Sequence, residues 1–163
     1  MKSIEKLIKN FLMPEVQIEK KVNNFIKLQS TNKLMKLLKL ILRKKLILKY
    51  KNTIGINVKA KGILTLPHPY NITIGDEVKI GKNCIIYQNV TIGKKSDFYL
   101  QNKERDKYPI IGDNVIIYAG AVIIGNITIG NNVIIAANSV VTIDVPANSI
   151  VGGIPAKILK KRS

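Results

Sequence analysis

The chain lacks the residues on which disulfide-rich proteins and many zinc enzymes depend. Its 163 residues include one cysteine, one histidine and no tryptophan. A single cysteine excludes a disulfide framework and favours a reducing compartment. A zinc site built from histidines needs several imidazoles, so one histidine per chain excludes that class of enzyme. We therefore expect neither a disulfide-stapled secreted domain nor a bound metal.

Acidic residues and long apolar runs are also scarce. Ten acids stand against 27 lysines and arginines, which gives a formal net charge of +17. The most apolar stretch, residues 34–50, carries six lysines and arginines, so it is not a membrane-spanning helix. The N-terminus has neither the uninterrupted apolar core nor the cleavage site of a secretory signal. These features predict a cytoplasmic protein.

Residues 1–51 are predicted to form a basic helical segment with 14 basic residues against three acids. Pro14 interrupts the first helix, and residues 30–32 offer N-cap oxygens for a second. Two interpretations of this segment stay open. The second helix packs on the protein or on a sister subunit with a solvated basic face, or residues 30–50 lie on an anionic membrane surface. Its apolar residues at helical spacing are Leu34, Leu37, Leu38, Ile41 and Leu42.

Residues 52–163 follow a different rule, with an aliphatic residue at every sixth position. A period of six fits neither a helix nor a hairpin, and it predicts a short strand and a turn repeated many times as a parallel β-helix. Cys84 falls at an inward position of this repeat, so we expect an inert core thiol. The repeating aliphatics are Ile74, Ile80, Ile86, Ile92, Ile111, Ile117, Ile123, Ile129, Ile135 and Val141.

The repeat is interrupted once. Residues 94–109 are polar and charged and cannot belong to a face of the coil, so we expect an extruded loop of the kind that often carries function. The repeat then resumes and ends in a C-terminal extension over residues 147–163.

The repeat resembles the hexapeptide of the left-handed parallel β-helix acyltransferases. The segments "LPHPYNITIG" and "IGKNCIIYQNVTIG" resemble the histidine-containing coil of serine acetyltransferases and of small O-acetyltransferases found with capsule and exopolysaccharide enzymes. The Pro-His-Pro-Tyr form is more similar to the second group. The resemblance implies a mainly β fold, a homotrimer with active sites between subunits, and acetyl-CoA as co-substrate.

His68 is the predicted general base. A strictly continued repeat would point it into the apolar core, but Pro67 and Pro69 restrict the backbone and predict a local departure that brings the ring to the surface. Acetyl transfer to a hydroxyl needs a base that titrates near neutrality. No protein nucleophile is required if donor and acceptor meet in one ternary complex, and backbone N–H groups are candidates to stabilise the oxyanion.

The chain departs from the serine acetyltransferase pattern at two places. That family has an acidic residue upstream of its catalytic histidine, whereas this chain has no acid between Glu19 and Asp76. It also has a second histidine in the acceptor site, at the position of Tyr108. These departures favour a sugar hydroxyl over free serine as acceptor. The group that orients His68 stays open among Asp97, Glu104, Asp106, Asn71 and a backbone carbonyl.

The resemblance also implies the remaining site residues. Small side chains would admit the pantetheine arm, and a basic residue near the C-terminus would face the nucleotide phosphates. Corner packing is an alternative role for Ala119 and Ala137. Tyr87 and Asn89, with Gln88 between them, either line the acceptor pocket or cap a corner. The expected CoA contacts are Ala119, Gly120, Ala137, Asn138, Thr142 and Lys157.

We therefore predict an acetyl-CoA-dependent O-acetyltransferase acting on a sugar, a nucleotide-sugar or a polysaccharide precursor. Serine O-acetyltransferase is the alternative of the same class. A non-catalytic β-helix binding or scaffold protein is the alternative from another class. No aromatic-interleaved basic motif indicates nucleic-acid binding, and phosphate-rich ligands account for the positive charge equally well.

Overall fold

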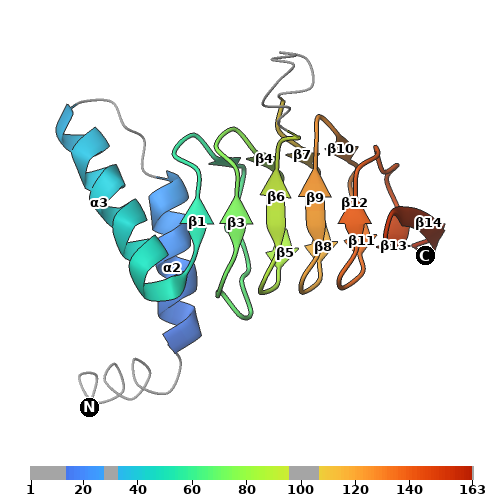
Figure 1. Cartoon of the computed structure of the whole chain (residues 1–163), viewed down its shortest axis with the longest axis horizontal. Helices are drawn as coiled ribbons and strands as arrows, with labels where there is room; N and C mark the ends of the chain where they lie inside the picture. The colour runs from blue at the N-terminus through green and yellow to red at the C-terminus, as the bar shows by residue number, and fades with distance from the viewer. Residues whose placement is uncertain (1–13, 28–32, 96–106, 163) are drawn as a thin grey trace.

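The computed structural model describes residues 14–27, 33–95 and 107–162. Two helices, α2 (Pro14–Lys27) and α3 (Lys33–Tyr50), lie at one end of a column of short strands, and the C-terminus lies near the other end (Figure 1). Within these residues, neither helix is long and apolar enough to cross a membrane.

The strands form three sheets, which are the three faces of a prism. Face A contains β1 (Thr53–Ile54), β3 (Thr73–Ile74), β6 (Thr91–Gly93), β9 (Val122–Ile124) and β12 (Val140–Val141). Face B contains β2 (Lys59–Ala60), β4 (Lys79–Ile80), β7 (Ile110–Ile111) and β10 (Thr128–Ile129). Face C contains β5 (Ile85–Ile86), β8 (Ile116–Ile117), β11 (Ile134–Ile135), β13 (Ser149–Gly153) and β14 (Ala156–Lys161).

Parallel pairing stacks equivalent positions of successive coils. Thr73 pairs with Thr91, and Ile74 pairs with Ile92, so the two threonines both point outward and the two isoleucines both point inward. The inward aliphatics form one continuous core, and Cys84 is fully buried within it. Among the strands of the described residues, only β14 runs antiparallel to its neighbour. The predicted fold, a left-handed parallel β-helix with an N-terminal helical segment, is confirmed.

Asparagines form the turns at the corner between faces B and C. Asn83, Asn114, Asn132 and Asn148 all have positive φ, between 54° and 58°. Asparagine tolerates this left-handed conformation better than most residues. Each side chain donates to the next across the coils, at 3.1, 3.1 and 3.0 Å. This ladder stabilises the corner along the prism.

The helices close the N-terminal end of the core. Asn23 of α2 is buried; its amide donates to the carbonyl of Leu64 at 2.9 Å and accepts from the N–H of Leu64 at 2.8 Å. Phe25 is fully buried, and the Lys39 ammonium lies 5.3 Å from its ring centroid. Burial lowers the pKa of Lys39, an effect that the charge of Asp76 partly opposes.

The apolar side chains of α3 are not all buried. Leu46 and Tyr50 are buried against the rest of the protein, whereas Leu37 and Ile41 are 55% and 56% exposed. Within the predicted stripe, Leu42 packs against the core whereas Leu37 and Ile41 face away from it, because α3 has apolar residues on both its inner and its outer face. The side chains of Leu34 and Leu38 lie outside the described residues.

Candidate active site

His68 lies on a bulge at the corner between faces C and A, which we call the His68 corner. The inward residues Leu66 and Ile72 are six positions apart, whereas the equivalent Ile86 and Val90 of the next coil are four apart. The extra two residues leave the helical path, and Leu66 takes the inward position. His68 is consequently exposed, as its flanking prolines predicted.

A buried amide beneath the bulge holds its backbone. Asn52 has no exposed surface; its Nδ2 donates to the carbonyl of Pro69 at 2.7 Å, and its Oδ1 accepts from the N–H of Ile72 at 2.9 Å. Within the bulge, the N–H of Tyr70 donates to the carbonyl of His68 at 2.8 Å. Asn52 was missed by the sequence analysis because its partners lie one coil away, at a spacing that only the pairing of β1 with β3 reveals.

Aromatic rings continue from His68 along the corner. The centroids of His68 and Tyr87 are 6.3 Å apart, and Tyr87 stacks on Tyr118 at 5.1 Å with an angle of 25° between the rings. Tyr118 was also missed, although it follows inward Ile117 as Tyr87 follows inward Ile86. That equivalence was the available signal. The three rings lie in a row along the His68 corner, and the small residues follow further along the same corner.

Those small residues lie on the same corner as His68. Backbone hydrogen bonds run from Gly120 N to Gln88 O at 3.0 Å and from Asn138 N to Ala119 O at 2.9 Å, so the coils are in register here. Gly120 has a φ of +72°, and a Cβ there would collide with Asn138 Oδ1. Glycine adopts this conformation without strain, and a side chain here would have to displace the Asn138 amide.

Lys157 lies at the far end of this line. It pairs with Gly152 across β13 and β14, and a Cβ on Gly152 would lie 3.2 Å from the Cβ of Ala136, the neighbour of Ala137. Lys157 is exposed, and its backbone lies beyond the small residues along the prism axis. His68 stands at one end of the corner and Lys157 at the other.

Tyr108 and Thr142 do not lie at the His68 corner. Both belong to the corner between faces A and B, which we call the loop corner because the predicted loop, residues 94–109, connects β6 of face A to β7 of face B; residues 96–106 lie outside the described residues. The Tyr108 ring lies directly over Gly75 and leaves no space for a side chain there. The Lys94 ammonium is 5.9 Å from the Tyr108 ring centroid. Within one chain, these two residues therefore lie at a different corner from His68.

Only some of the predicted partners of His68 belong to the described residues. Asp97, Glu104 and Asp106 lie outside the described residues. The amide of Asn71 donates to Asn89 Oδ1 at 3.1 Å, which extends a ladder along the corner. In the part of the chain that the structure describes, no group of three or more histidine, cysteine or acidic residues could hold a metal ion.

Cys84 matches the expected core thiol. It is fully buried, and its sulfur lies 3.2 Å from the carbonyl oxygen of Gly112. Burial is the main cause that raises the pKa of this thiol. Because the thiolate is the reactive form, Cys84 is not suited to act as a nucleophile.

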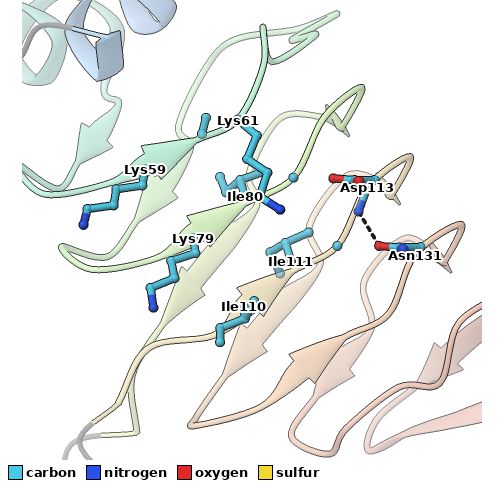
Figure 2. A pocket seen from close by; sticks show the side chains of 11 residues that line it. Lys59, Lys61, Lys79, Ile80, Ile110, Ile111, Asp113 and Asn131 are labelled. Carbon is cyan, nitrogen blue, oxygen red and sulfur yellow. Dashed lines mark hydrogen bonds between the residues drawn. The ribbon is translucent and has the colours of Figure 1, made fainter.

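A separate basic pocket of about 470 Å³ lies on face B, opposite the His68 corner. Lys59 and Lys79 project from neighbouring strands in the same direction, and Lys61 lies nearby (Figure 2). At the far side, the N–H of Asp113 donates to Asn131 Oδ1 at 2.8 Å. None of the predicted site residues lines this pocket.

Comparisons with known proteins match this geometry. A family model described as "Bacterial transferase hexapeptide (six repeats)" matches residues 108–142. A serine acetyltransferase of Staphylococcus xylosus is 50% identical over 99 residues, which cover 60% of this chain and 43% of the relative. A solved serine acetyltransferase of Neisseria gonorrhoeae in complex with serine has a TM-score of 0.66 at 36% identity. The match covers 75% of this chain and 48% of the solved chain.

A third relative is a solved serine acetyltransferase in complex with CoA. It has a TM-score of 0.67 at 31% identity, and the match covers 80% of this chain and 51% of the solved chain. The chain therefore spans about half the length of the relatives it matches. The resemblance to hexapeptide-repeat, serine acetyltransferase-like proteins is confirmed.

Proposed function

We propose that this chain is an acetyl-CoA-dependent O-acetyltransferase with His68 as the general base. The observation that carries this proposal is the single exposed imidazole on a fixed bulge, at the head of a corner lined by Ala119, Gly120 and Ala137. The similarity to a serine acetyltransferase in complex with CoA supports the same donor.

In the proposed reaction, His68 accepts the proton of the acceptor hydroxyl as its oxygen attacks the thioester carbonyl. The carbon–oxygen bond forms, the carbon–sulfur bond breaks, and the proton passes from the imidazolium to the departing thiolate. Exposed backbone N–H groups along the corner are the candidates to stabilise the oxyanion. No covalent acetyl-protein intermediate is needed, and the buried Cys84 does not take part.

The donor would lie along the His68 corner. A pantetheine arm would run past Gly120, which has no side chain of its own and is covered by the amide of Asn138. The exposed ammonium of Lys157 would face the phosphates at the far end. Asn138, which is also exposed, offers an amide to the arm between these two points. We keep these roles as proposals for the binding of CoA.

For the acceptor, the comparisons favour serine over the sugar hydroxyl that the sequence indicated. The support is the 50% identity to a serine acetyltransferase over 99 residues of this chain, and the similarity to a solved serine acetyltransferase in complex with serine. A sugar acceptor remains the second candidate because Tyr108 stands where serine acetyltransferases carry a second histidine. Tyr87, Tyr118 and Asn89 would then line the acceptor side of the site.

A thiol-release assay across acceptors tests this choice. The wild-type protein with acetyl-CoA is given L-serine, simple sugars or nucleotide-sugars, and the released CoA thiol is measured. We expect turnover with L-serine well above the rate of hydrolysis without acceptor. Turnover with a sugar or nucleotide-sugar alone would move the assignment to the second candidate. If none of these acceptors increased the release of CoA, the proposed O-acetyltransferase activity itself would be contradicted.

We also propose a homotrimer. The His68 corner and the loop corner are the two edges of face A, so a three-fold arrangement around this face would bring Tyr108 and Thr142 of one subunit toward His68 of the next. Such an assembly accounts for predicted site residues that a single chain keeps apart.

Contact of α3 with an anionic membrane is a further proposal. The outer face of α3, which we call the α3 stripe, exposes five aliphatic side chains beside basic residues. Exposed apolar patches of this kind commonly mark an interaction site. The stripe consists of Leu37, Leu40, Ile41, Ile47 and Leu48.

A further inference from the structure

The bulge around His68 is a local exception in an otherwise regular prism. Elsewhere each coil fixes the next through its backbone hydrogen bonds, but the two additional residues after Leu66 fall outside that ladder. Pro67 and Pro69 restrict φ and lack an N–H, so they stiffen the segment without tying it to a neighbouring strand. The position of the imidazole therefore depends on what else holds the bulge.

Asn52 is the side chain that holds it from beneath. Its amide binds the carbonyl of Pro69 at 2.7 Å and the N–H of Ile72 at 2.9 Å, and it is completely buried. One contact fixes the residue next to His68, and the other fixes the point where the chain rejoins the regular coil. The N–H of the adjacent Thr53 donates to Ile72 O at 2.9 Å, so Asn52 is itself anchored in the ladder.

We infer that Asn52 is a positioning residue for His68, acting through the backbone of the bulge. This inference rests on the proposed function, because it assigns Asn52 a part in the reaction of that site. The amide is chemically specific here, since it supplies one donor and one acceptor to two fixed partners. An aspartate would keep the acceptor but set an oxygen against the Pro69 carbonyl in a buried space, where an unpaired polar group is costly.

Asn23 provides a matched control. It is also a buried asparagine whose amide binds one backbone carbonyl and one backbone N–H, at 2.9 and 2.8 Å. These two bonds go to Leu64 and join α2 to the first coil, away from the bulge, and Nδ2 also donates to the carbonyl of Glu19 within α2 at 3.0 Å. Asn23→Asp therefore removes the same kind of bond without touching the segment that carries His68.

The single histidine allows a direct readout. In protein labelled at histidine, the imidazole signals in an NMR spectrum come from His68 alone. We would compare the wild type with Asn52→Asp and Asn23→Asp by these signals, by thermal unfolding, and by kcat and KM for acetyl-CoA. Asn52→Ala is the second variant, because it leaves space for water if the aspartate prevents folding.

We expect the Asn52 variants to shift or broaden the His68 signals and to lower kcat by about 10- to 100-fold with little change in KM. Asn23→Asp should lower stability while the His68 signals and kcat stay as in the wild type. Wild-type His68 signals and kcat in a folded Asn52 variant would overturn the inference. If the wild type transfers no acetyl group, the proposed function fails, but the NMR comparison still tests the role of Asn52.

Discussion

At the scale of single residues, the His68 corner is built from backbone conformations that few residue types tolerate. Asn71, Asn89 and Asn138 have φ between 54° and 59°, and Gly120 at the equivalent position has a φ of +72°. The Asn71 amide donates to Asn89 along the corner, whereas at Gly120 the Asn138 amide occupies the space that a side chain would take. The proposed CoA arm would pass this point of the corner.

The first prediction concerns Gly120. Gly120→Ala places a Cβ against Asn138 Oδ1 at a positive φ, so we expect the free energy of unfolding to fall by about 1–3 kcal/mol. The added methyl also occupies the proposed path of pantetheine, so CoA affinity should fall as well. Denaturant unfolding and a CoA titration measure the two effects.

Gly93→Ala is the control for Gly120→Ala. A Cβ on Gly93 would have no atom within 4 Å, and its φ is not positive. This variant should keep wild-type stability and CoA affinity. Equal losses in both variants, or full CoA affinity in Gly120→Ala, would contradict the proposed donor path.

Some residues of the site were predictable and others were not, for a physical reason. His68 was identifiable because an imidazole between two prolines breaks a strict period. Tyr87 and Asn89 follow the period and fall on the same corner. Asn52 was not identifiable, because its role depends on which residue of the next coil lies above it, and the number of residues in each coil has to be known first.

At the scale of elements, α3 has two apolar faces with different surroundings. Leu46 and Tyr50 are buried, whereas Leu40 and Leu48 on the opposite side are 49% and 67% exposed. Lys44 lies among the exposed aliphatics, and its charge would oppose a symmetric contact between two copies of this face. An anionic lipid surface accepts both the aliphatics and the lysines.

The second prediction tests the α3 stripe. The protein should cosediment with vesicles that contain phosphatidylglycerol, less with pure phosphatidylcholine, and less at high salt. The double variant Leu40→Gln, Leu48→Gln should weaken this binding by about tenfold or more, because each side chain loses its apolar contact.

Ile143→Gln is the matched control for the stripe, since Ile143 is 49% exposed on the prism and distant in sequence from α3. It should bind vesicles as the wild type does. Equal vesicle binding by the stripe variant and the control would exclude the membrane. A concentration-dependent increase in mass that the stripe variant abolishes would instead assign the α3 stripe to contact between copies of the chain.

At the scale of the whole molecule, a period of six determines the fold but not the position of each corner. The inward column was correct over ten repeats because each aliphatic has one place in the core. The period alone does not say which corner follows which strand. Thr142 was grouped with Ala137 and Asn138 for this reason, yet β12 lies between them and carries Thr142 to the loop corner.

The third prediction concerns assembly. If sites form between subunits, sedimentation velocity at micromolar concentration should give one species at three times the chain mass of 18.2 kDa. A stable monomer with full transfer activity would contradict the shared site, because Tyr108 and Thr142 could not then approach His68.

The most direct test of the account is the replacement of its only histidine. His68→Ala removes the proposed base from an exposed bulge without opening a cavity in the core. We expect acetyl-CoA turnover with acceptor to fall by about 10²–10⁴-fold, while thermal unfolding and CoA affinity stay close to those of the wild type. Undiminished turnover in a folded His68→Ala protein would contradict the account.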